Sequence, residues 1–182
     1  SGMDAGFSML TDILSGYFDK LLLAPINRFS ILFGSLLVAG TRALIQSVVI
    51  VFLAILLGVS FKGGIAGIAA VVLMTTTFGI AWSCLGLIIA LWTKNVQATN
   101  SSFVLFFPFL FLTTAFMPKE FLARWFQIAA ALNPVNYIME GMRTIVIQGW
   151  QWSTILPGLW ILATMTVGLM ALAAWLFRKA TT

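Results

Sequence analysis

Four long apolar runs without a charged residue divide the chain. Each is about as long as, or longer than, the roughly 20 residues that a helix needs to cross a bilayer. The runs are Ala43–Phe61, Gly63–Thr93, Asn95–Pro118 and Thr144–Phe177. They predict an all-α, polytopic membrane protein whose four transmembrane helices lie at residues 33–59, 65–92, 98–116 and 153–177.

The stretch between the third and fourth spans has a different pattern. From Phe121 to Leu132, large apolar residues recur at helical spacing, and charged residues occupy the other side. Asn133-Pro134 then interrupts the chain. Proline cannot continue a helix but can occupy its first turn, so a second helix should begin there with Asn133 as its N-cap. Residues 119–147 are therefore predicted to form a broken, re-entrant helix pair at the membrane edge.

The second helix of this pair carries Glu140 and Arg143, which are three residues apart and share one face. A lone charge near membrane depth is costly, so we expect the two to neutralise each other or to pair with a partner subunit. Two roles remain open for them. They could pin the helix pair so that it closes the outer end of a pathway, or they could contact a substrate.

Short turns and small residues indicate how the spans meet. Residues 60–64 form a tight turn, which predicts that the flanking spans are antiparallel neighbours. Gly63 and Gly67, and further along Gly79 and Ser83, place small residues four apart, as close contact between membrane helices prefers.

The N-terminal stretch is amphipathic rather than uniformly apolar. Residues 12–28 include the sequence SGYFDKLLLAPINR, and they predict a short helix on the membrane surface. Its apolar residues, with Lys20 and Arg28, would suit docking on another protein. An interfacial helix that only anchors the chain is the alternative.

Arg42 and Gln46 interrupt the first apolar stretch. Either the span begins near Arg42, or the helix begins near Ser30 and carries Arg42 several turns into the membrane. In the simpler interpretation the Arg42 side chain snorkels to the interface. In the other, Arg42 and Gln46 face a pathway or a partner subunit.

Composition excludes several classes of protein. The chain is 61% hydrophobic and 8% charged, whereas soluble domains average about 25% charged residues. The net charge of +5 comes from basic residues scattered at the ends of apolar runs, so it does not indicate nucleic-acid binding. A single cysteine, Cys84, excludes an internal disulfide and reads as a small buried apolar residue. The absence of histidine excludes His-dependent nucleophilic sites and His-ligated metal, and no P-loop sequence occurs.

The basic residues also predict an orientation. With both ends cytoplasmic, six basic residues lie inside and four outside, in the sense of the positive-inside rule. The inner set is Lys20, Arg28, Arg42, Lys94, Arg178 and Lys179, and the outer set is Lys62, Lys119, Arg124 and Arg143. The broken helix pair then faces outward.

Two segments resemble the permease subunit of type-2 ATP-binding-cassette (ABC) exporters, a group that contains bacterial drug, nodulation-factor and polysaccharide exporters. Gly16–Arg28 is similar to the family's G-x-hydrophobic-(D/E)-(R/K)-L-L-x-(A/S)-P-hydrophobic-x-R loop. Phe116–Arg143 is similar to its segment ending in N-P-hydrophobic-x-Y-x-x-E-x-x-R, which here gives Asn133, Pro134, Tyr137, Glu140 and Arg143. Ala123 stands where the family often has proline, so the start of the re-entrant pair is expected to differ.

The resemblance implies a six-span subunit of the bacterial plasma (inner) membrane, of which residues 1–182 would hold the last four spans. It implies a partner ABC ATPase subunit that binds ATP and magnesium, so this chain would carry no cofactor or metal and would not itself be an enzyme. It also implies a second permease subunit, in a homodimer or a heterodimer. The ATPase-coupling residues would be Gly16, Phe18, Lys20, Leu21, Leu22, Pro25 and Arg28.

The expected function is therefore that of the membrane permease of an ATP-driven exporter for a drug-like, lipid or glycan substrate. A non-transporting membrane anchor or assembly subunit is the alternative. An ion-driven secondary transporter would need acidic residues inside its spans, and the four predicted spans contain none.

Overall fold

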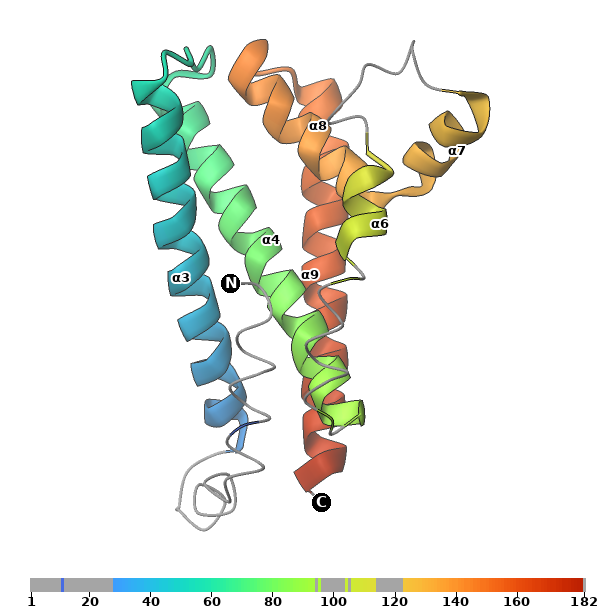
Figure 1. Cartoon of the computed structure of the whole chain (residues 1–182). Coiled ribbons are helices and arrows are strands. Elements are labelled where there is room, and N and C mark those ends of the chain that lie inside the picture. Colours follow the sequence, from blue (N-terminus) through green and yellow to red (C-terminus); the bar gives the residue numbers. More distant parts are fainter. Residues whose placement is uncertain are drawn as a thin grey trace. The chain divides into compact units, whose positions relative to one another are not determined.

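The structure, a computed structural model, describes residues 28–93, 95, 104, 106–113 and 123–181, together with Thr11. Throughout these ranges the regular structure is helical, as predicted, and contains no strand. Figure 1 labels the helices in chain order. They are α3 (Arg28–Leu56), α4 (Gly64–Thr93), α6 (Phe106–Phe111), α7 (Arg124–Leu132), α8 (Pro134–Ile147) and α9 (Trp152–Thr181).

Three of the described helices are long and apolar enough to cross a membrane. The candidate spans are Leu32–Leu56, Gly64–Thr93 and Trp152–Lys179. Of the span predicted at residues 98–116, the structure describes only residue 104 and residues 106–113. These include the short helix α6 and a turn at Leu112. A fourth span therefore stays a prediction. The surface helix predicted at residues 12–28 also lies outside them, apart from Arg28 at the start of α3.

Helix α3 ends earlier than residue 59 because a glycine stops it. Gly58 adopts a φ of 87°, a conformation that is free of strain only without a side chain. The N–H of Gly58 donates to the carbonyl of Ile55, and the N–H of Val59 donates to that of Ala54. This pair of hydrogen bonds is a Schellman motif, which satisfies carbonyls that the last helical turn would leave open.

The contacts between helices divide the chain into two compact units. The first unit comprises Ser1–Ile45, Thr76–Phe103 and Met165–Thr182, and the second comprises Gln46–Thr75 and Val104–Thr164. Helices α3, α4 and α9 each contribute residues to both units.

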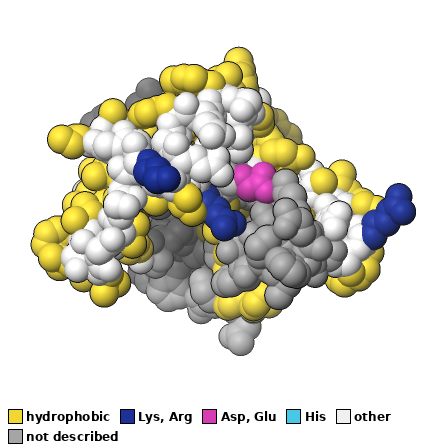
Figure 2. Space-filling model, turned by 90° about the horizontal axis from the view of Figure 1, so that it is seen from above, with side chains coloured by type: hydrophobic (Ala, Val, Ile, Leu, Met, Phe, Trp, Pro, Cys, Tyr) yellow, Lys and Arg dark blue, Asp and Glu magenta, His cyan; other side chains and the backbone are white. Residues whose placement is uncertain are grey.

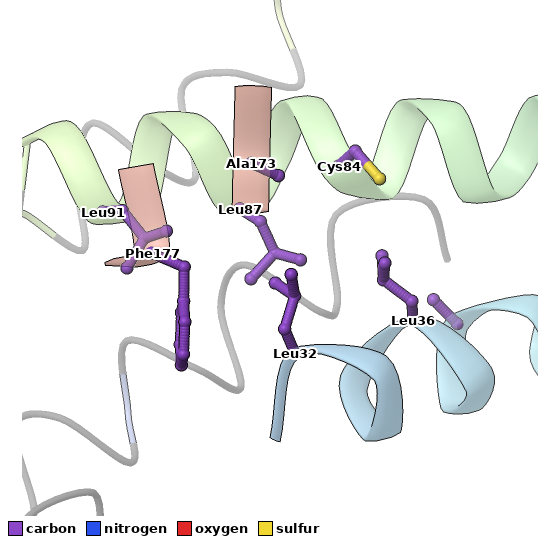
Figure 3. Packing of buried hydrophobic residues seen from close by; sticks show 8 residues of the cluster. Leu32, Leu36, Cys84, Leu87, Leu91, Ala173 and Phe177 are labelled. Carbon is purple, nitrogen blue, oxygen red and sulfur yellow. The ribbon is translucent and has the colours of Figure 1, made fainter. Parts of the chain in front are cut away.

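Apolar side chains from α3, α4 and α9 form the core of the first unit (Figure 3). Leu32 and Leu87 point toward each other, and Cys84 is fully buried, as its apolar surroundings in the sequence predicted. The buried residues recur at helical spacing, so each helix presents one stripe to the others. They are Leu32, Leu36, Ala39, Cys84, Leu87, Leu91, Ala173 and Phe177.

Helices α3 and α4 approach closely in the first unit where small residues meet. A methyl group added at Gly79 would lie 2.8 Å from the Cβ atom of Ala43, and one added at Gly40 would lie 3.1 Å from Cδ1 of Ile80. The order of these contacts is reversed along the two helices. The antiparallel pairing predicted from the turn at residues 60–64 is therefore confirmed.

Candidate functional site

The break between α7 and α8 is built around Asn133. Its side-chain oxygen accepts a hydrogen bond from the N–H of Val135 at 3.0 Å, and Pro134 is the first residue of α8. The prediction that Asn133 caps the helix is confirmed. Its backbone is extended, with φ −82° and ψ 114°, which is the conformation favoured both at an N-cap and before a proline.

The amide nitrogen of the Asn133 side chain links α8 to α6. The Nδ2 atom of Asn133 donates to the carbonyl of Phe109 at 2.6 Å and to that of Leu112 at 3.0 Å. Phe109 lies in the last turn of α6 and Leu112 directly follows it, the part of a helix where carbonyls need partners from outside the helix. The buried side chain of Asn133 therefore satisfies one helix start and one helix end together, a role that sequence reasoning missed.

Tyr137 of α8 forms a hydrogen bond back to α7 across this break. Its hydroxyl donates to the carbonyl of Ala131, in the last turn of α7, at 2.9 Å. Helix α7 begins at Arg124, after an N-cap residue, Ala123, that makes no side-chain capping bond. The first part of the predicted pair, residues 119–122, lies outside the described residues.

The C-terminal end of α8 is bound to the turn between α3 and α4. The N–H of Lys62 donates to the carbonyl of Val146 at 2.9 Å, and the N–H of Gly63 donates to that of Ile145 at 3.1 Å. The indole N–H of Trp150 donates to the carbonyl of Gly63 at 3.3 Å. The turn that joins two candidate spans and the end of α8 therefore lie together.

Small residues allow α8 to lie close to the start of α4 and close to α9. Methyl groups added at Gly63 or Gly67 would lie 3.0 Å from Cγ2 of Ile145, so the close approach predicted for these glycines occurs, with α8 as the partner. On α9, a methyl group added at Gly158 would lie 2.6 Å from the carbonyl oxygen of Tyr137.

Glu140 and Arg143 line one pocket of about 280 Å³ at the exposed side of α8. Thr144, Ile147 and Gln148 continue the α8 wall, and Thr154 contributes from α9. Figure 2 shows the acidic side chain, in magenta, beside a basic one in dark blue. The structure thus brings both predicted residues to one site, while their direct pairing stays a prediction. No pattern in the sequence pointed to Gln148 or Thr154 as pocket residues.

Arg42 and Gln46 lie on one exposed face of α3. Because α3 is continuous from Arg28, Arg42 lies about 15 Å along the helix from the start of the candidate span at Leu32. The helix therefore begins well before Arg42, as the second alternative expects, and the depth of Arg42 in the membrane stays a prediction. Whether the guanidinium snorkels or faces a pathway stays a prediction.

The predicted ATPase-coupling residues lie outside the described residues, except Arg28, which begins α3. Within the described ranges, no group of three or more His, Cys, Asp or Glu side chains that could hold a metal ion is found. The described site thus consists of a helix break, the residues that cap it and a polar pocket.

The sequence of the chain is similar to those of known transport proteins. Residues 3–147 match the protein family described as ABC-2 type transporter. The chain is 32% identical over 145 residues to a putative transport permease, ycf38, of Porphyra purpurea, covering 79% of this chain and 50% of that protein. It is 30% identical over 145 residues to a daunorubicin resistance ABC transporter permease protein, DrrB1, of Streptomyces coeruleorubidus, covering 78% and 50%.

A probable doxorubicin resistance ABC transporter permease protein, DrrC, of Mycobacterium tuberculosis is 24% identical over 134 residues, covering 74% of this chain and 49% of that protein. The chain thus spans about half the length of these curated relatives. No solved structure matches it.

Proposed function

The chain belongs to the ABC-2 type transporter family, and we propose that it forms part of the membrane permease of an ATP-driven exporter. The observation that carries this proposal is the family match over residues 3–147, which includes α3, α4 and the broken pair α7–α8. Relatives named as drug-resistance ABC transporter permeases support it. In this role the protein is a multi-pass membrane subunit that supplies the pathway.

The energy would come from a separate ATPase subunit that binds ATP and magnesium. The Gly16–Arg28 segment is the proposed docking element, because its apolar and basic side chains suit contact with another protein. A second permease subunit would complete the pathway, and Arg42 and Gln46 on the exposed face of α3 are proposed to face that pathway or the partner subunit.

The proposed substrate is drug-like and largely apolar. Two relatives carry the names of daunorubicin and doxorubicin resistance, which supports this class for a related protein. An apolar pocket of about 360 Å³ between α3, α4 and α9 in the first unit also suits an apolar molecule. Lipids and glycans remain the other classes that the family resemblance allows.

The broken pair α7–α8 is proposed to face outward and to close the outer end of the pathway. The bonds from Lys62 and Gly63 to the end of α8 support this role, because they fix the pair to the turn between two spans. With Cys84 replaced, a cysteine at Lys62 should react with an impermeant thiol reagent from outside, and one at Lys94 only from inside. The reverse labelling pattern would overturn the orientation.

The function is tested in a complex reconstituted from the full-length permease and its ATPase. We expect added substrate to stimulate ATP hydrolysis. The Leu21→Asp and Leu22→Asp variants should insert into the membrane normally but lose this stimulation. A complex in which substrate never stimulates ATP hydrolysis would favour the non-transporting anchor.

A further inference from the structure

The apolar pocket of the first unit lies between the candidate spans of α3, α4 and α9. One face of α3 between residues 33 and 44 forms its longest wall, Thr76 and Ile80 contribute from α4, and Thr166 and Met170 contribute from α9. All these positions fall inside the three candidate membrane spans. A ligand in this pocket is therefore placed at the depth of the hydrocarbon layer and not at a water-exposed surface.

The wall of the apolar pocket offers almost no polar atoms to a ligand. The hydroxyl of Thr41 donates to the carbonyl of Leu37, one turn earlier in α3, at 2.8 Å, so this polar group is satisfied within its own helix. A polar ligand would lose its hydrogen bonds to water here without regaining them, which is costly. The chemistry of the wall therefore selects a hydrocarbon group.

The length of the apolar pocket matches one leaflet of a bilayer. Between Phe33 and Leu44, the two ends of the α3 wall, the helix rises by about 16 Å, which is about half of the roughly 30 Å of a hydrocarbon core. Phe33 directly follows the first residue of its candidate span, Leu44 is the midpoint of that span, and Thr166 lies at the midpoint of the α9 span. The pocket therefore runs from one surface of the hydrocarbon layer to its middle.

The width of the apolar pocket narrows the occupant to a single chain. Its volume of about 360 Å³, spread over that length, gives a mean cross-section of about 20 Å². One extended, unbranched hydrocarbon chain fills such a cross-section, whereas a chain with methyl branches is wider. An acyl chain of a membrane phospholipid has this length, width and chemistry, and the bilayer supplies it directly beside the pocket.

We propose that the apolar pocket binds one unbranched acyl chain of a phospholipid from the leaflet in which α3 begins. The ester end of the chain lies near Phe33, and the methyl end lies near Leu44 and Thr166. The chain supplies van der Waals contacts to three helices whose association depends on such contacts, so it stabilises the first unit. The inference rests on the membrane placement of α3, α4 and α9 and is independent of the proposed transport activity.

The first test compares two phosphocholine lipids on the purified full-length protein in detergent. One carries unbranched palmitoyl chains, and the other carries phytanoyl chains, which have the same backbone length but bear methyl branches. At about 100 times its dissociation constant, the unbranched lipid should raise Tm by about 5 °C. The branched lipid at the same concentration should have a clearly smaller effect. Equal shifts for the two lipids, or no shift with either, would overturn the proposal.

Photo-cross-linking tests where the chain lies. Two versions of the palmitoyl lipid carry a photoreactive diazirine, one at the methyl end of the chain and one beside the ester. The first should attach mainly at Leu44 and Thr166, and the second mainly at Phe33. Val38 and Ile45 are the control positions, because they are exposed on α3 and do not line the pocket. Attachment to the control positions as heavy as that to the lining residues would indicate only the general layer of lipid around the protein and would overturn the proposal.

A matched pair of variants tests whether the pocket itself binds the lipid. Leu37→Trp adds a large ring at a lining residue, whereas Val38→Trp adds the same ring at an adjacent exposed residue that does not line the pocket. Leu37→Trp should weaken binding of the palmitoyl lipid about tenfold, and Val38→Trp should leave it unchanged. Wild-type binding by Leu37→Trp, or equal losses for the two variants, would place the lipid elsewhere and overturn the proposal.

Discussion

In the first unit the helices meet through apolar side chains such as Leu32, Leu87 and Phe177. In the second unit, hydrogen bonds from Asn133, Trp150 and the backbone of Lys62 and Gly63 join the elements in addition to apolar packing. The second unit contains the helix ends around Asn133 and Gln148, and each end leaves backbone groups without a partner in its own helix. Inside or near a bilayer, protein groups must satisfy them, because little water is available.

The same difference determines what holds each unit together. Between membrane helices there is little hydrophobic driving force, because lipid is as apolar as leucine, so the first unit depends on close van der Waals packing. The second unit depends in addition on a few specific polar atoms. Substitutions of those atoms should therefore cost more than substitutions of apolar residues of similar burial.

Asn133→Ala should have the largest effect. It removes the cap of α8 and both bonds to the carbonyls of Phe109 and Leu112. With about 1 kcal/mol for the cap and about 1 kcal/mol for each of the two lost hydrogen bonds, the free energy of unfolding should fall by about 3 kcal/mol. Asn133→Asp keeps the capping oxygen and loses the donor, so its loss should be intermediate. Denaturant unfolding of the purified full-length protein measures both, and a wild-type midpoint for Asn133→Ala would contradict the comparison.

Gly158→Ala and Gly168→Ala form a matched pair on α9. A methyl group at Gly158 meets the carbonyl oxygen of Tyr137 at 2.6 Å, whereas one at Gly168 has nothing within 4 Å. The first substitution must push α8 and α9 apart and should cost about 2 kcal/mol. The second should stabilise the helix by about 0.5 kcal/mol, because alanine is the better helix former. Thermal unfolding that shifts in the same direction for both variants would show that space at Gly158 is not limiting.

The sequence predicted those features of α8 that depend on near neighbours. The cap requires only Asn133, Pro134 and the N–H of Val135, all adjacent in the chain, and so its chemistry is visible in the residue types. The bond to Phe109 joins residues 24 positions apart. No local pattern distinguishes an asparagine that only caps a helix from one that also binds a second helix.

The glycines likewise show that the sequence predicts a close contact without predicting its partner. Gly63 and Gly67 indicated a close contact, and the contact exists, but its partner is Ile145 of α8. A small residue reveals that something approaches closely and does not reveal which element does. Similarly, Glu140 and Arg143 were expected on one face, whereas the contribution of Thr154 to their pocket depends on how α9 packs on α8.

Leu87→Ala tests the apolar side of the comparison. Leu87 is fully buried in the first unit, whereas Leu73 on the same helix is 63% exposed. In water such a substitution costs 2–5 kcal/mol through a transfer term and a cavity term. Because lipid removes most of the transfer term, we expect a loss of about 1 kcal/mol for Leu87→Ala and close to none for Leu73→Ala. If Leu87→Ala loses more stability than Asn133→Ala in the same unfolding assay, apolar packing in the first unit contributes more than the polar contacts of the second.

Trp150→Phe should have the smallest effect and is the most specific test of the hydrogen bonds. The change removes the indole N–H that donates to the carbonyl of Gly63 at 3.3 Å, and keeps an aromatic ring beside Trp152. Hydrogen bonds between membrane helices contribute about 0.6 kcal/mol on average, and this one is long, so a loss of about 0.5 kcal/mol is expected. Trp152→Phe is the control, since it alters the other ring of the pair and leaves the bond to Gly63 in place. If unfolding midpoints show equal losses for the two variants, Trp150 acts through its ring, and the polar link between α8 and the α3–α4 turn reduces to the backbone bonds of Lys62 and Gly63.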